Sequence, residues 1–89
     1  MGEIELIDID LVLKIYEDLM EKYNSGGMLR DSKLLESAIY GVKNYSIYNN
    51  DVTICDLAAA YCFYLCQNHA FTDGNKRIAF FTMAYFLRY

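Results

Sequence analysis

The chain has 89 residues, 55% of them apolar, and a net charge of −4 at pH 7. This length predicts a single domain, 1–89, with a modest core. An acidic chain is a poor candidate for nucleic-acid binding, which depends on neutralising phosphates. No apolar run reaches the ~20 residues of a membrane span, and the acidic N-terminal residues do not form a signal peptide. Three cysteines without scaffold spacing predict reduced thiols. We therefore expect a cytoplasmic protein.

The N-terminal part of the chain predicts one helix. Residues 3–7 alternate polar and apolar side chains, which allows a short N-terminal strand before it. Asp8 or Asp10 is a suitable N-cap. The apolar stripe of the helix consists of Leu11, Ile15 and Leu19. The Asn-Ser-Gly-Gly run at 24–27 tolerates positive φ and is expected to end the helix.

A second helix is expected from Ser32 to about Lys43, because Asp31 can cap it and apolar residues recur at helical spacing. Residues 44–52 are rich in Asn and Tyr and are expected to form a loop. The 26–27 glycine pair permits either a plain helix–helix connection or a mobile flap. The sequence does not separate these two interpretations.

Two strongly apolar helices are predicted in the C-terminal half. Thr53, with Asp56 three residues later, is typical of a capping box that begins a helix over 53–68. Residues 57–66 contain no polar side chain beyond tyrosine hydroxyls, so this helix should be central. A fourth helix over 75–88 is similarly apolar. We expect an all-α fold, a small helical bundle with these two helices as a central antiparallel pair.

The segment between these two helices reads His-Ala-Phe-Thr-Asp-Gly-Asn-Lys-Arg over 69–77 and has the composition of a phosphate-transfer site. Histidine is the side chain best suited to general-base chemistry near neutral pH, so His69 is the candidate base. Asp73 offers the hard oxygen ligand that Mg²⁺ prefers, so it is the metal candidate. Gly74 lets the backbone approach a ligand closely.

The start of the following helix adds positive charge to this segment. The free N–H groups of a helix N-terminus attract anions, and Asn75, Lys76 and Arg77 occupy that position. Residues 69–89 carry one acid and three bases, whereas 1–68 carry eleven acids and five bases. We therefore predict that Gly74 and these three residues bind phosphate groups, with Lys76 and Arg77 neutralising their charge.

The 69–77 segment resembles the signature of the Fic/Doc family, the death-on-curing proteins and their adenylylating relatives. That signature runs His-Pro-Phe-x-Asp/Glu-Gly-Asn-Gly-Arg-x-x-Arg. It is matched by His69, Phe71, Asp73, Gly74, Asn75 and Arg77. Ala70 replaces the proline, Lys76 the second glycine and Phe80 the second arginine, and the last two changes are those of the Doc branch. The 27–31 and 34–38 segments also resemble Doc-like proteins.

The resemblance implies a toxin of a toxin–antitoxin system, controlled by a separate antitoxin protein. It implies transfer of a phosphoryl group from ATP, with Mg²⁺, to a hydroxyl of elongation factor Tu, and hence inhibition of translation. By the same resemblance, residues 74–77 would bind the nucleotide, and Lys76 and Arg77 would also act in catalysis. Transfer of AMP to a protein hydroxyl is the alternative within the family. Relatives usually continue with further helices beyond the last one predicted here, and we expect this domain to lack them. An inactive fragment or a protein-binding module is therefore a third alternative, and we expect self-association or a partner to cover apolar surface.

Cys62, Cys66 and His69 lie at i, i+4 and i+7 and are a competing metal-ligand set. Their spacing matches no common zinc module. Cysteine in an apolar helix usually packs as a small hydrophobic residue, and packing is the interpretation we favour.

Overall fold

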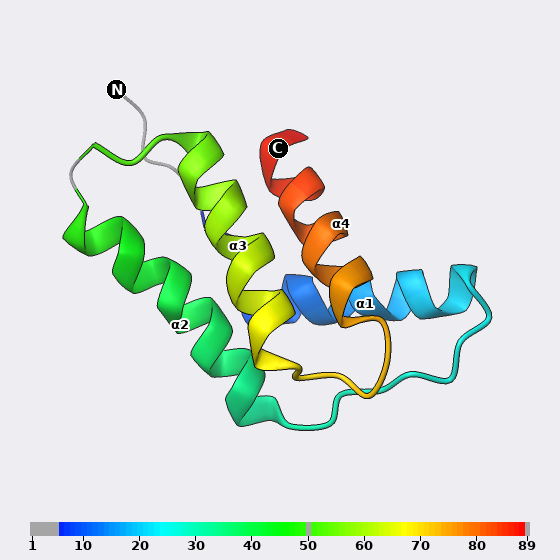
Figure 1. The fold of residues 1–89 in the computed structure, drawn as a ribbon. Helices are drawn as coiled ribbons and strands as arrows, with labels where there is room; N and C mark the ends of the chain where they lie inside the picture. The colour runs from blue at the N-terminus through cyan, green and yellow to red at the C-terminus, as the bar shows by residue number, and fades with distance from the viewer. Residues whose placement is uncertain (1–5, 50, 89) are drawn as a thin grey trace.

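The computed structural model describes residues 6–49 and 51–88 and is all-α within them, as predicted (Figure 1). Its helices are α1 (Ile9–Lys22), α2 (Ser32–Tyr48), α3 (Ile54–Asn68) and α4 (Asn75–Arg88). Residues 3–5 of the predicted N-terminal strand lie outside the described part of the chain, and Leu6 and Ile7 are not in a strand. None of the described helices is long and apolar enough to cross a membrane.

Side-chain caps set the starts of the first three helices. Asp8 caps α1 by accepting the N–H of Leu11 at 3.0 Å. Asp31 caps α2, as predicted. Thr53 and Asp56 form the predicted capping box, with reciprocal hydrogen bonds of 3.0 and 3.1 Å. Each cap satisfies N–H groups that a helix start leaves without partners.

The prediction that α2 ends near residue 43 was wrong, because the helix continues to Tyr48. The polar residues of the expected loop bond to the helix itself. Ser46 donates its hydroxyl to the carbonyl of Lys43 at 2.7 Å. Asn49, just past the end, donates its side-chain N–H to the carbonyl of Tyr45 at 2.8 Å. Asn49 thus satisfies a carbonyl that the helix end leaves without a partner, and Ser46 bonds back to the helix rather than outward into a loop.

The central position predicted for α3 is confirmed. It packs between α2 and α4, and α1 crosses behind and contacts α4 and α2 (Figure 1). The side chains that all four helices bury share one core. Its largest fully buried members are Tyr61, Phe71, Leu35, Leu57, Ile78, Val12 and Val42. Helices α3 and α4 run antiparallel, so the loop between them is held by two packed elements.

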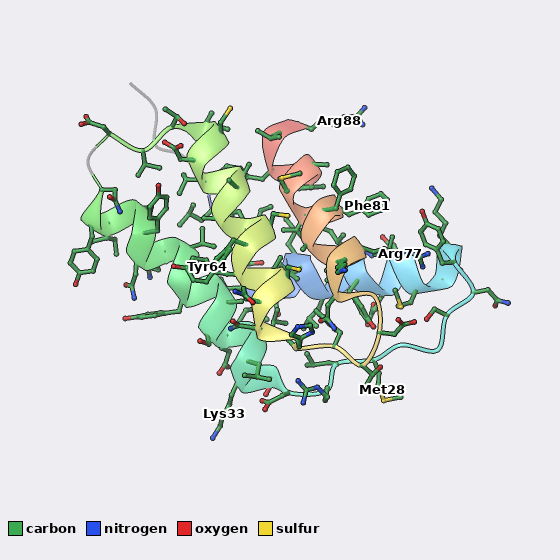
Figure 2. All side chains as sticks on the ribbon, viewed as in Figure 1. Met28, Lys33, Tyr64, Arg77, Phe81 and Arg88 are labelled. Atoms are coloured by element: carbon green, nitrogen blue, oxygen red, sulfur yellow. The ribbon has the colours of Figure 1, made fainter. Side chains whose placement is uncertain are left out.

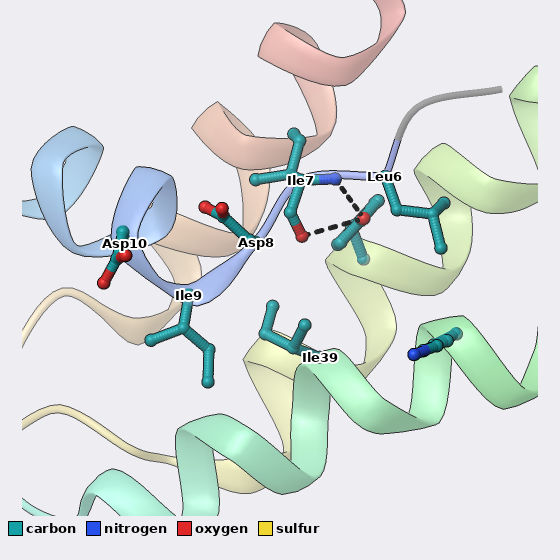
Figure 3. A pocket seen from close by; sticks show the side chains of 8 residues that line it. Leu6, Ile7, Asp8, Ile9, Asp10 and Ile39 are labelled. Carbon is teal, nitrogen blue, oxygen red and sulfur yellow. Dashed lines mark hydrogen bonds between the residues drawn. The ribbon is translucent and has the colours of Figure 1, made fainter.

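Tyr61 fixes the segment that leads into α1. Its hydroxyl accepts the N–H of Ile7 at 2.7 Å and donates to the carbonyl of the same residue at 3.2 Å (Figure 3). Burial raises the pKa of this phenol to about 12. An open pocket lies beside the segment, lined mainly by apolar side chains that include Leu6, Ile9 and Ile39 (Figure 3). None of its lining residues belongs to the 69–77 segment.

Helices α3 and α4 are not covered on every side. Phe63 on α3 and Phe80 on α4 are each 56% exposed, and Ile54 and Leu87 are also exposed. The buried side of α3 presents Leu57, Ala58, Ala60, Tyr61 and Leu65 to the core. The apolar sequence of both helices therefore exceeds what the other described helices cover.

Candidate functional site

The candidate site is built on the loop that joins α3 to α4. His69 is the C-cap of α3 and adopts a left-handed conformation, with φ 51° and ψ 48°. This conformation turns the chain away from the helix axis. The residue is exposed, and its carbonyl accepts a hydrogen bond from the guanidinium of Arg30. The proposed base thus lies at one end of the loop and the start of α4 lies at the other.

Asn75 closes the loop with its side chain. Its amide oxygen accepts the N–H of Phe71 at 3.1 Å, and its amide nitrogen donates to the carbonyl of Phe71 at 2.9 Å. The Phe71 ring is buried and stacks on Tyr16 of α1, with the ring centroids 3.8 Å apart. Both polar atoms of the Asn75 side chain are therefore used within the loop. Only the backbone N–H of Asn75 is available to an anion.

Asp73 is held by three hydrogen bonds. One carboxylate oxygen accepts the N–H of Gly74 at 2.8 Å, and the other accepts the hydroxyl of Ser25 at 3.2 Å. The backbone carbonyl of Asp73 accepts the hydroxyl of Tyr16 at 2.8 Å. Burial raises the pKa of Tyr16, and the nearby Asp73 charge raises it further, so this phenol is a hydrogen-bond donor at neutral pH.

The donor set around Asp73 fits Mg²⁺. The side chain is exposed, and each of its oxygens keeps a lone pair beyond the one that accepts a hydrogen bond. Magnesium is commonly held by one or two carboxylates, with phosphate oxygens and water completing its shell. Among the described residues, no three His, Cys, Asp or Glu side chains gather to hold a metal ion. A cation held at Asp73 would take its remaining ligands from phosphate oxygens and water.

The start of α4 carries free N–H donors and positive charge. In the described part of the chain, the backbone N–H groups of Asn75, Lys76 and Arg77 have no hydrogen-bond partner, as is general at helix starts. Lys76 and Arg77 are exposed. Gly74 has a left-handed φ of +76°, which L side chains rarely adopt, and a Cβ there would lie 2.9 Å from the Met20 side chain. Its role is to make this turn, since its own N–H is bonded to Asp73.

The connection between α1 and α2 runs along the candidate loop (Figure 1). Leu29 and Phe71 form an isolated antiparallel bridge. The N–H of Thr72 donates to the carbonyl of Met28 at 2.9 Å, and the N–H of Arg30 donates to the carbonyl of Ala70 at 2.7 Å. The 26–27 glycine pair therefore belongs to a connection that is hydrogen-bonded to the site.

Arg77 rests on an aromatic ring from α1. Its guanidinium carbon lies 4.3 Å from the centroid of the Tyr23 ring, and Tyr23 is the C-cap of α1. Figure 2 shows Arg77 at the first turn of α4, beside α1. A cation over a tyrosine face is stabilised by about 0.5–1 kcal/mol at exposed positions. The ring therefore restricts the conformations open to Arg77.

The structure thus places every predicted site residue on one loop and the first turn of α4. The sequence analysis missed Tyr16, Tyr23 and Ser25, which reach this loop from α1 and its C-terminal end. Their only sequence signal is the neighbouring glycine pair, which permits a close approach. In the competing metal-ligand set, Cys62 and Cys66 are half-buried and pack against the core.

Comparison with known proteins supports the resemblance of the signature. Residues 6–87 match the sequence model of the Fic/DOC family. Comparison with curated proteins and with solved structures gives no match. The match covers nearly the whole chain, including the helices that carry the loop, and members of this family generally transfer nucleotide groups to proteins. The chain belongs to the Fic/DOC family.

Proposed function

We propose that this protein is a Doc-like toxin that transfers the terminal phosphoryl group of ATP to a protein hydroxyl. The observation that carries the proposal is the short distance in sequence between three complementary groups. Unpartnered N–H groups and two cations open α4, a hydrogen-bonded carboxylate precedes them, and an exposed histidine begins the same loop. Phosphoryl transfer is catalysed mainly by such positioning and charge stabilisation.

In the proposed reaction His69 takes the proton of the target hydroxyl. The hydroxyl oxygen forms a bond to the γ-phosphorus, and the bond from that phosphorus to the β–γ bridging oxygen breaks. ADP leaves with the electron pair. The N–H groups at the start of α4, with Lys76 and Arg77, stabilise the charge that develops on the phosphates. When bound at Asp73, Mg²⁺ supplies additional neutralisation of that charge.

Lys76 supports phosphoryl rather than AMP transfer. AMP transfer in the family uses a glycine at this position, where the α-phosphate approaches the backbone. An exposed lysine occupies it here, and its bulk and charge favour the reversed nucleotide that presents the terminal phosphate. The alternative, AMP transfer, forms a bond from the target oxygen to the α-phosphorus and releases pyrophosphate.

Labelled ATP separates these two reactions. The protein is incubated with elongation factor Tu, the target that the resemblance implies, and with ATP labelled at either the α or the γ phosphate. We expect label on the target from γ-labelled ATP only. Label from α-labelled ATP would remove the phosphoryl-transfer proposal and support AMP transfer. Lys76→Gly should shift labelling towards the α phosphate if this side chain sets the orientation of the nucleotide.

The conformation of His69 decides which variant tests its role. An alanine in the left-handed conformation costs about 1–2 kcal/mol, so His69→Ala combines loss of the base with backbone strain. Asparagine tolerates this conformation and lacks a base that titrates near pH 7. We expect His69→Asn to fold with wild-type helicity and to abolish both transfer and growth arrest on expression. Full toxicity in a folded His69→Asn protein would instead support a binding module.

The exposed apolar side chains Phe63 and Phe80 support a partner protein, and for a Doc-like toxin we propose the antitoxin or a second copy of the chain. Sedimentation of the purified protein, alone and with the product of a neighbouring reading frame, tests this. The three free cysteines support a reducing, cytoplasmic location.

A further inference from the structure

We propose that Ser25 is a positioning residue for the Asp73 carboxylate and thereby sets the affinity of the site for a divalent cation. The inference rests on the proposed function, because it assumes that Asp73 holds the cation. In the described part of the chain, Ser25 is the only side chain that donates a hydrogen bond to the carboxylate of Asp73, whereas Tyr16 donates to the backbone carbonyl. It lies 48 residues before Asp73 in the sequence.

A second hydrogen bond, from Gly27, orients the hydroxyl of Ser25. The N–H of Gly27 donates to the Ser25 oxygen at 3.2 Å. Because that oxygen accepts from Gly27, the serine proton is available for Asp73. The other oxygen of Asp73 is bonded to the N–H of Gly74 at 2.8 Å. Two donors on the two oxygens restrict rotation of the carboxylate, so its free lone pairs keep a defined direction.

Ser25 is itself anchored to α1. Its N–H donates to the carbonyl of Met20 at 2.9 Å, and the preceding Asn24 adopts a left-handed conformation with φ 53°. The same helix supplies Tyr16, whose hydroxyl bonds to the backbone carbonyl of Asp73. Helix α1 therefore holds Asp73 through both its backbone and its side chain, and Ser25 supplies the side-chain part.

The expected effect is on cation affinity. Loss of a group that orients a metal ligand typically lowers affinity by about 10–100-fold. The Ser25 bond is exposed, which places the effect at the low end of that range, at about tenfold. A serine that only supports the fold would instead lower the melting temperature and weaken nucleotide binding with and without metal alike.

The experiment measures binding of adenylyl imidodiphosphate, an ATP analogue, by the full chain, once with Mn²⁺ and once with EDTA. The dissociation constant in EDTA divided by the dissociation constant in Mn²⁺ gives the factor by which the metal strengthens binding. We expect Ser25→Ala to reduce this ratio about tenfold and to leave binding in EDTA unchanged. Ser25→Thr keeps the hydroxyl and should restore the ratio. Ser37→Ala, which changes an exposed serine on α2, is the matched control.

The outcomes separate this inference from the proposed function. If the wild-type protein binds no analogue, or binds it equally with Mn²⁺ and EDTA, the proposed metal site fails and the inference with it. If the wild type shows the metal effect and Asp73→Asn removes it, but Ser25→Ala retains it in full, only the inference fails. If Ser25→Ala weakens binding of the analogue equally in Mn²⁺ and in EDTA, Ser25 has a purely structural role and the inference is overturned.

Discussion

Gly27 lies where α1, its C-terminal connection and the candidate loop come closest, and we expect Gly27→Ala to destabilise the protein. A Cβ at Gly27 would lie 2.8 Å from the sulfur of Met20 and 3.3 Å from the Cβ of Asp73, and it would also collide with the Tyr16 hydroxyl. That hydroxyl cannot move aside freely, because it donates to the Asp73 carbonyl at 2.8 Å. The extra methyl group must therefore shift the loop.

The magnitude follows from two opposing terms. Overpacking a tight site costs about 1–3 kcal/mol, and replacing glycine with alanine returns about 0.4–1 kcal/mol by restricting the unfolded chain. The net loss relative to the wild type is about 0–2.6 kcal/mol. A chain of this length has a total stability of roughly 4–13 kcal/mol, so the variant still folds. Gly26→Ala is the matched control, since a Cβ at Gly26 meets nothing within 4 Å.

Thermal unfolding followed by far-ultraviolet circular dichroism measures the difference. One kcal/mol corresponds to about 4–8 °C in Tm for a domain of this size. Both variants share the gain from restricting the unfolded chain, so only the overpacking cost separates them, and we expect the Tm of Gly27→Ala to lie about 4–24 °C below that of Gly26→Ala. Equal Tm values for the two variants would refute the close approach of Gly27 to Tyr16 and Met20.

Three further changes probe the core and the loop. Tyr61→Phe leaves the N–H of Ile7 without its partner and should lower the free energy of unfolding by about 1–3 kcal/mol in chemical denaturation. The unfolded phenol titrates near pH 10 and the folded one near 12. Between these values the folded state binds more protons, so stability falls as pH rises; Tyr61→Phe should flatten that fall, and an unchanged slope would contradict the assignment. Thr82→Val removes a buried hydroxyl that has no hydrogen-bond partner among residues 6–49 and 51–88 and should raise Tm, whereas a lower Tm would indicate a partner outside them. Asn75→Ala removes both bonds to Phe71 and should cost about 1–3 kcal/mol, and hydrogen exchange at the Phe71 amide should accelerate; unchanged exchange would argue against this closure of the loop.

Most of the fold could be predicted because its determinants are local. The caps at Asp31 and Thr53 act within three residues of themselves, and the start of α4 follows directly from Gly74. The end of α2 was missed, because Ser46 and Asn49 bond backward to helix carbonyls and such residues are also common in loops.

The signature residues could be identified from their spacing, but their supports could not. Tyr16 lies 57 residues from Asp73 in the sequence, and Tyr23 meets Arg77 only after α1 has packed against α4. No local pattern encodes such contacts. The two hydrogen bonds from the Asn75 side chain to the Phe71 backbone also could not be predicted, because they depend on the shape of the turn between these residues.

Two residues at the end of α1, Tyr23 and Ser25, touch the guanidinium and the carboxylate of the site, respectively. A molecule that displaced residues 23–25 from the loop would break both contacts at once without touching the 69–77 segment. Binding of such a molecule at the C-terminal end of α1 would therefore regulate the proposed reaction.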